Sequence, residues 1–121
     1  MTISVIIVNY NVKYYISQCI DSVLKAADGM EVEIIVVDNH SSDGSISYLR
    51  QQYPNIRIMA SSHNLGFSRA NNIGIKRSEG EFLLLLNPDT IIEKDTLKKC
   101  VDFMREHEDC GAVGVCQRHP Y

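Results

Sequence analysis

The chain has 121 residues, of which 45% are hydrophobic and 22% are charged, and its formal net charge is −3. This length predicts one domain over residues 1–121, since domains usually hold roughly 100–200 residues, and the composition excludes a disordered or fibrous chain. The longest apolar run, Phe82–Leu86, is far shorter than the roughly 20 residues of a membrane-spanning helix, and the lack of a broad basic cluster excludes nucleic acid as a partner.

Strand-like and helix-like segments alternate along the first half of the chain. Residues Ile3–Val8 form a β-branched run that is too apolar for a half-exposed strand, so they predict a central strand covered on both faces. Apolar residues spaced by three and four follow from Ile16 to Ala27 and predict a helix that ends at Gly29. A second buried strand is predicted at Val32–Val37.

The second half continues the same alternation. Side chains suited to N-caps at residues 41–44 predict a helix that runs toward Tyr53 and is closed by Pro54. The remaining expected elements are a strand at 56–60, a helix at 67–77, a strand at 81–86, a helix with Leu97, Cys100, Val101 and Met104 on one face, and a fifth strand at 111–115. This order predicts βαβ units and therefore an α/β fold, with a parallel sheet covered by helices on both faces.

Polar residues gather where the predicted strands end. The four groups are Asn9–Asn11, Asp38–His40, His63–Asn64 and Asn87–Asp89. In an open parallel sheet the carboxyl ends of the strands lie at one edge, and ligands bind at that edge. The sequence therefore predicts a binding site there.

Asp89 is the strongest candidate for metal binding. It follows five consecutive apolar residues and a turn in which Pro88 restricts the backbone. A carboxylate in that place suits Mg²⁺ or Mn²⁺, which take one or two carboxylates together with phosphate oxygens. The alternative is a plain Asn-Pro-Asp turn that caps the next helix.

Other strand-end residues are candidates for contact with a ligand. Asp38 and Asn39 can bond the edge of a base or ribose hydroxyls, although a helix-entry turn explains them equally well. Tyr10 can stack on a base or pack at the surface. Gly66 permits close approach of the backbone to a ligand, and Arg69 meets a phosphate unless it is simply solvated.

The cysteines and the missing motifs narrow the function further. The four cysteines include no CxxC pair, so we expect reduced thiols and a protein of the cytosol or the cytosolic face of a membrane. The histidines show no ligand spacing and are expected to be non-catalytic. The sequence contains no GxGxxG, GxxxxGK[ST] or GxSxG motif, which excludes a dinucleotide fingerprint, a P-loop and a nucleophile elbow.

Four segments taken together resemble the family-two inverting glycosyltransferases, and within that family most closely the bacterial rhamnosyltransferase-like members. The segments are residues 5–11, 36–45, 64–67 and 85–89, and the resemblance covers nearly the whole chain. It implies a GT-A fold, in which a Rossmann-like, mainly parallel sheet binds a nucleoside-diphosphate sugar (dTDP-, UDP- or GDP-linked) with a divalent metal. The chain is then the nucleotide-sugar-binding half of such an enzyme, whose acceptor is a saccharide or a lipid-linked molecule.

The resemblance also implies roles for individual residues. Residues 87–89 take the place of the family's Asp-x-Asp motif, with Asp89 as the metal ligand and Asn87 in place of the first Asp. Asn39 stands where most members have Asp, which leaves the identity of the base open. The nucleotide-sugar site is expected to comprise Asn9, Tyr10, Asp38, Asn39, Asn64, Gly66, Arg69 and Asn87.

The family's catalytic Asp, which deprotonates the acceptor hydroxyl, lies well beyond the Asp-x-Asp strand. No acidic residue follows Asp109 here, so we expect the general base beyond Tyr121 and an acceptor-binding part that this chain lacks. On this hypothesis the chain binds the donor, is inactive alone, and self-associates through surface that a missing part would cover.

Two other classes of α/β protein have similar alternation. A response-regulator receiver needs an acidic pair after its first strand, where Asn9 and Tyr10 stand, and an Asp at the end of the third, where residues 60–63 are Ala-Ser-Ser-His. A nucleotidyltransferase normally has a Gly-rich basic loop after the first strand, and residues 9–13 do not form one. Both remain alternatives to the glycosyltransferase prediction.

Overall fold

The computed structural model of the chain describes residues 2–107. Within this range four strands and four helices alternate: β1 (Ile3–Asn9), α1 (Lys13–Ala26), β2 (Val32–Asp38), α2 (Ser45–Gln52), β3 (Arg57–Ala60), α3 (Phe67–Arg77), β4 (Phe82–Leu86) and α4 (Thr96–Glu106). The strands form one sheet in the order β3-β2-β1-β4, and every pairing is parallel. The predicted α/β class is therefore confirmed, while the strand predicted at 111–115 lies outside the described residues.

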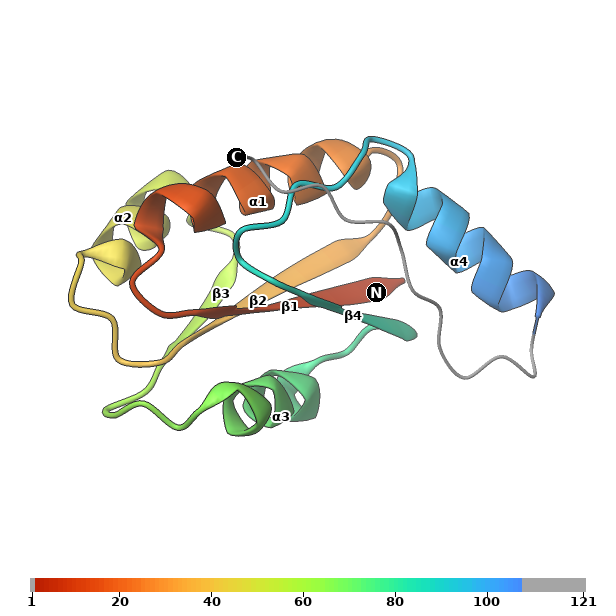
Figure 1. The fold of residues 1–121 in the computed structure, drawn as a ribbon. Helices are drawn as coiled ribbons and strands as arrows, with labels where there is room; N and C mark the ends of the chain where they lie inside the picture. The colour runs from red at the N-terminus through yellow and green to blue at the C-terminus, as the bar shows by residue number, and fades with distance from the viewer. Residues whose placement is uncertain (1, 108–121) are drawn as a thin grey trace.

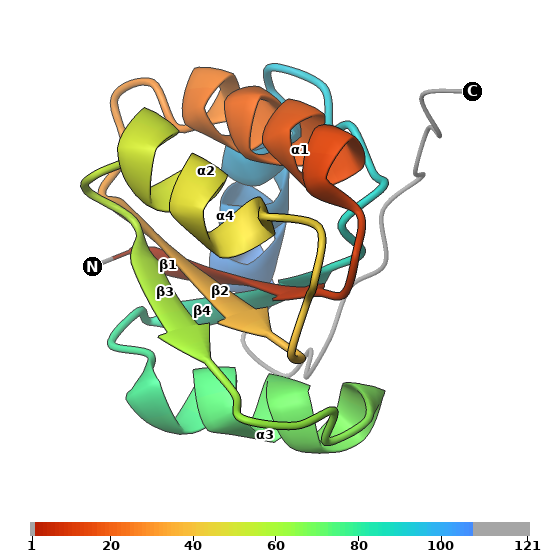
Figure 2. The ribbon, with the colours of Figure 1, turned by 90° about the vertical axis from the view of Figure 1, so that its left-hand side faces the viewer.

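Helices lie on both faces of this sheet. Helices α1 and α2 cover one face and α3 covers the other, as Figures 1 and 2 show. Because side chains alternate along a strand, β1 sends Ile3, Val5 and Ile7 into the core under α1, and Ile6 and Val8 into a smaller core against α3. All seven residues of β1 are buried, as predicted for a central strand.

The edge strand β4 is covered on one face only. Its burial alternates, and Leu83 and Leu85 are 46% and 47% exposed. The pairing register places Leu85 beside Ile6, which faces α3, so the exposed leucines lie on that side of the sheet. Helix α3 packs on β1 and β2 instead. An apolar run of five residues therefore does not mean burial on both faces here.

Contacts between segments decide where the first two helices begin. The apolar stripe of the first helix starts at Ile16, but α1 already begins at Lys13, whose backbone N–H donates to the Asp43 carboxylate at 3.1 Å. The same carboxylate accepts from the backbone N–H and the hydroxyl of Ser45 at the start of α2. One side chain thus accepts hydrogen bonds from the first residues of two helices. No helix within residues 2–107 has both the length and the hydropathy of a membrane span.

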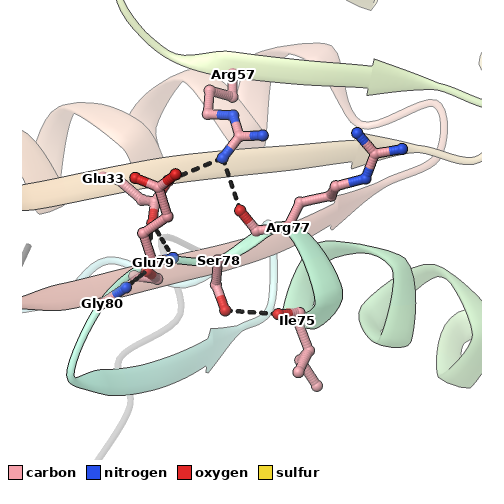
Figure 3. A network of polar contacts seen from close by, with 8 residues as sticks. Glu33, Arg57, Ile75, Arg77, Ser78, Glu79 and Gly80 are labelled. Carbon is pink, nitrogen blue, oxygen red and sulfur yellow. Dashed lines mark hydrogen bonds and ion pairs between the residues drawn. The ribbon is translucent and has the colours of Figure 1, made fainter.

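A polar network lies at the amino-terminal edge of the sheet, opposite the predicted binding edge (Figure 3). The Glu33 carboxylate accepts from Ser4 Oγ at 2.6 Å, from the Glu79 N–H at 2.7 Å and from Arg57 at 3.1 Å. Ser4 Oγ in turn accepts from the Gly80 N–H at 2.8 Å. A Cβ at Gly80 would lie 2.5 Å from the Ser4 backbone nitrogen, so this close approach requires glycine. The network fixes the α3–β4 connection against β1 and β2.

Candidate functional site

The strand-end groups meet at one edge of the sheet. Asn9 at the end of β1 pairs with Asp38 at the end of β2, and Asp38 pairs with Ala60 at the end of β3. The loops that follow these strands lie together at the left of Figure 1. The parallel topology thus brings together residues that are far apart in the sequence.

Asn9 and Asp38 bond each other at the point where β1 and β2 end. Asn9 Nδ2 donates to Asp38 Oδ1 at 2.7 Å and approaches Ser41 Oγ at 3.2 Å, while Asp38 Oδ2 accepts from the Ser41 N–H at 2.8 Å. Asn9 and Asp38 are buried, and both Asp38 oxygens already accept hydrogen bonds from the protein. In this structure the pair holds the two strand-end loops together, and contact of either residue with a base or ribose stays a prediction.

The loops after β1 and β2 have unusual backbone conformations. Asn11 has a φ of 53° and His40 a φ of 69°, in the left-handed region that residues other than glycine seldom adopt. Asn11 is held there by Ser41 Oγ, which accepts its N–H at 2.9 Å, and by the Ser42 N–H, which donates to Asn11 Oδ1 at 2.7 Å. Such conformations cluster at functional sites, where the surrounding structure maintains them.

The loop before α3 is tied to the end of β2. Asn39 Nδ2 donates to the Gly66 carbonyl at 3.2 Å, and Asn39 Oδ1 accepts from the Leu65 N–H at 3.1 Å. Asn64 Oδ1 accepts from the Gly66 N–H at 2.8 Å. Three predicted site residues, Asn39, Asn64 and Gly66, therefore form one hydrogen-bonded unit.

A pocket of about 440 Å³ opens at this edge, between the ends of β1 and β4 and the start of α3. It is lined by Val8, Tyr10, Val12, Tyr15, Phe67, Asn87, Pro88 and Asp89. Aromatic rings suited to stacking thus stand beside amide and carboxylate oxygens. A larger hollow of about 860 Å³ lies between α1 and residues 91–94, but none of the predicted site residues lines it. The chemistry therefore favours the smaller pocket.

The turn after β4 is anchored to α1. The Cys19 thiol donates to the Asn87 carbonyl at 3.6 Å, and the Thr90 N–H donates to the same carbonyl at 3.1 Å. Burial, together with the negative charge of Asp89, raises the pKa of Cys19 to about 12. The thiol is therefore protonated at neutral pH and acts as a donor that supports the turn, since only a thiolate binds metals or attacks as a nucleophile.

Residues 4–121 match the family described as Glycosyl transferase family 2. The chain belongs to this family. The match agrees with the resemblance seen in the four motif segments, and it favours neither the receiver nor the nucleotidyltransferase alternative.

Two curated relatives and one solved structure show what the chain is similar to. It is 34% identical over 110 residues to the minor teichoic acid biosynthesis protein GgaB of Bacillus subtilis, covering 88% of this chain and 12% of that protein. It is 32% identical over 111 residues to the poly(ribitol-phosphate) beta-N-acetylglucosaminyltransferase TarS of Staphylococcus aureus, covering 88% and 19%. The crystal structure of TarS 1–349 in complex with UDP matches with a TM-score of 0.80 at 31% identity, over 97% of this chain and 38% of that chain.

The structural match confirms the GT-A-type α/β architecture. The chain spans only 12–19% of the length of these two curated relatives. What the whole of such a protein transfers, and to which acceptor, therefore belongs to the proposals below.

The side chains of the pocket suit a divalent metal that is held partly by the protein and partly by the phosphate oxygens of a diphosphate. No cluster of three or more His, Cys, Asp or Glu side chains that could hold a metal occurs within residues 2–107, so this part offers no all-protein cage. Asp89, which carries a carboxylate, and Asn87, which carries a side-chain amide, line the same pocket. Mg²⁺ is usually held by one or two carboxylates plus substrate phosphates, and the chemistry of Mn²⁺ is similar.

The predicted site residues fall into three groups. Tyr10, Asn87 and Asp89 line the pocket, whereas Asn9, Asp38, Asn39, Asn64 and Gly66 form the hydrogen-bonded support around it. Arg69 is exposed on α3 and does not line the pocket, so its contact with a phosphate stays a prediction.

Two aromatic residues of the pocket, Phe67 and Tyr15, were not among the predicted site residues. Phe67 directly follows Gly66, and an aromatic residue at the first position of a polar helix, outside any apolar stripe, is a signal that could have identified it. Tyr15 lies on α1 beside Ile16 but outside the buried stripe of that helix, and only the fold shows that it faces the pocket.

Proposed function

We propose that the chain binds a nucleoside-diphosphate sugar at the carboxyl edge of its sheet and is the donor-binding half of an inverting glycosyltransferase. The observation that carries this proposal is the pocket that brings Tyr10, Asn87 and Asp89 together with Phe67. A base can stack on a tyrosine ring, and the oxygens at the end of β4 suit a metal-bound diphosphate. Because TarS was solved with UDP, a UDP-linked sugar is our first candidate, with dTDP- and GDP-linked sugars next.

Each residue then has a defined task. Tyr10 at the rim stacks on the base, and its 50% exposure leaves the ring available to a ligand. Asp89, with Asn87, would hold Mg²⁺ or Mn²⁺ beside the diphosphate. Such a metal supplies Lewis-acid stabilisation of the charge that builds up on a departing diphosphate. The bond from Cys19 to the Asn87 carbonyl keeps the turn in the position that this task requires.

Sugar transfer with inversion also needs a general base within hydrogen-bond reach of the acceptor hydroxyl. We propose that this base comes from an acceptor-binding part outside the pocket described here, so that donor binding and transfer are separable properties. GgaB and TarS are named for teichoic acid biosynthesis and for glycosylation of poly(ribitol-phosphate). By similarity we place the acceptor among cell-wall or other bacterial polysaccharides, including lipid-linked precursors.

The donor site is proposed to work in the cytosol or at the cytosolic face of a membrane. Cys19 and Cys100, the cysteines within residues 2–107, are both free thiols, which suits a reducing compartment. The resemblance to rhamnosyltransferase-like members concerns the identity of the sugar. The preference among UDP, dTDP and GDP in the titration proposed next is the first test of it.

Calorimetric titration of the folded chain with UDP, dTDP and GDP, each with and without Mn²⁺, tests the proposal. We expect binding of one nucleotide that requires Mn²⁺ and that Asp89→Ala weakens at least about tenfold, as loss of a metal ligand should. Asp102→Ala is the matched control, because Asp102 is exposed on α4 away from the pocket. Nucleotide binding that does not depend on Mn²⁺ contradicts the proposal. So does the absence of binding by a chain that circular dichroism shows to be folded.

A further inference from the structure

The Asn39 side chain makes two bonds of opposite polarity to one loop. Its amide nitrogen donates to the Gly66 carbonyl at 3.2 Å, and its amide oxygen accepts from the Leu65 N–H at 3.1 Å. The residue is only 3% exposed, and its backbone N–H donates to the Asn9 carbonyl at 2.8 Å. An amide can donate and accept at once, whereas an ionised carboxylate only accepts. The two bonds to the loop therefore require an amide rather than a carboxylate at position 39.

The loop that Asn39 holds has a conformation that only glycine adopts readily. Gly66 has a φ of 83° and a ψ of 168°, a region that is essentially restricted to glycine. Its carbonyl accepts both from Asn39 and from the Ala70 N–H, which closes the first turn of α3. Asn39 therefore fixes the point at which α3 begins.

The first residue of α3 is Phe67, and it stands at the pocket. Its side chain is 58% exposed, yet it lines the same hollow as Tyr10 and Asp89. Tyr10, Tyr15 and Phe67 line this hollow together, and aromatic side chains gathered at one pocket favour contact with a ligand. Phe67 directly follows the Leu65–Gly66 corner, and the Asn39 amide bonds both residues of that corner.

We propose that Asn39 is a positioning residue that acts through Phe67: its amide holds the Leu65–Gly66 corner so that the Phe67 ring forms an apolar wall of the nucleotide pocket. This inference rests on the proposed function, since it concerns how the pocket holds a nucleoside diphosphate. It differs from the role that the family resemblance implies, in which Asn39 itself contacts the base or ribose. The amide and the ring form one unit, and loss of either opens the same wall.

A double-mutant cycle with UDP and Mn²⁺ tests this unit. The variants are Asn39→Asp, which removes the donor and sets a carboxylate oxygen against the Gly66 carbonyl, Phe67→Ala, and the two combined. We expect each single change to weaken UDP binding about tenfold, as loss of an aromatic wall should. The double variant should bind no more weakly than Phe67→Ala alone, because residues that act as a unit are not additive. If Asn39 had a purely structural role or contacted the base directly, it would act independently of Phe67. The fold-losses in UDP affinity of the two single variants would then multiply in the double variant.

Two variants keep the test decisive. Asn72→Asp places the same charge on an exposed position of α3 and should bind UDP as the unmodified chain does. Phe67→Ala alters an exposed side chain, so it tests the wall even if Asn39→Asp fails to fold. UDP binding by Phe67→Ala or by folded Asn39→Asp within about twofold of the unmodified chain, or multiplicative losses in the double variant, overturns this inference alone. Failure of the unmodified chain to bind any nucleoside diphosphate overturns the proposed function with it.

Discussion

Replacement of Glu33 by glutamine perturbs the network at the amino-terminal edge of the sheet while it preserves the size of the side chain. The carboxylate is 8% exposed and accepts three hydrogen bonds, from Ser4 Oγ, the Glu79 N–H and Arg57. Glutamine has one accepting oxygen and an NH₂ group that only donates. At least one of these three donors is then left facing another donor.

The magnitude follows from these contacts. Hydrogen bonds to charged groups contribute roughly 1.5–3 kcal/mol each, but the Arg57 contribution is discounted because that side chain is 43% exposed. Ser4 and Glu79 both donate to Oε2, so the glutamine oxygen can keep these two bonds at the strength of neutral ones, while Arg57 loses its partner at Oε1. We expect Glu33→Gln to lower the free energy of unfolding by about 1–3 kcal/mol near neutral pH. For a chain of this size the unfolding midpoint should fall by roughly 10 °C.

The loss should also depend on pH. Burial by itself raises the pKa of the Glu33 carboxyl, but the hydrogen bonds from Ser4, Glu79 and Arg57 outweigh burial and hold that pKa below its usual value. The folded-state pKa therefore lies below the unfolded value of about 4.3. The carboxylate stabilises the fold above the unfolded pKa, and this stabilisation is lost as the pH falls through the folded pKa. The gap between the two chains should be constant near neutral pH and narrow below about pH 4.

Urea unfolding followed by circular dichroism at about pH 7, 5 and 3 measures this gap. Glu106→Gln, an exposed position on α4, removes the same charge and should change the free energy of unfolding by less than about 0.5 kcal/mol. A Glu33→Gln loss as small as that of the control, or a gap as large at the lowest pH as at neutral pH, would show that the Glu33 carboxylate does not stabilise the fold in this way.

Three further changes probe other parts of the molecule. A Cβ at Gly74 would lie 2.6 Å from the Ile6 Cγ2 methyl of β1. Gly74→Ala should therefore lower the free energy of unfolding, measured by thermal denaturation, by about 1–3 kcal/mol; unchanged stability would contradict this close packing. Replacing Leu83 and Leu85 with serine should reduce the self-association measured by light scattering, and a chain that is already monomeric would contradict this expectation. Tyr10→Ala should weaken UDP binding about tenfold, whereas Tyr14→Ala, outside the pocket, should not; equal effects would argue against stacking on Tyr10.

The arrangement of the sheet and the place of the site were predictable because they depend on local patterns. Helix α3 was predicted at 67–77 and spans Phe67–Arg77. Gly66 precedes its first residue and the polar Ser78 follows its last. The buried strand β1 followed from its β-branched run. Once the strands were parallel, their polar ends had to meet at one edge, and Tyr10, Asn87 and Asp89 do share a pocket.

The rest depends on contacts between segments that no local pattern reveals. The start of α1 at Lys13 depends on the Asp43 carboxylate, 30 residues away. The support of the Asn87–Asp89 turn depends on Cys19, 68 residues from Asn87. The sequence predicts that Asn39 contacts a ligand, whereas in the structure its side-chain amide forms hydrogen bonds with the backbone of Leu65 and Gly66.

We expect a nucleoside diphosphate and a divalent metal to bind together at the Asn87–Asp89 turn. Amide NMR spectra of the chain with UDP and sub-stoichiometric Mn²⁺ test it most directly, because the paramagnetic ion broadens the signals of nearby residues. We expect broadening centred on residues 87–89, with Tyr10 also affected, and only when UDP is present. Broadening centred elsewhere, or the same broadening without nucleotide, would contradict it.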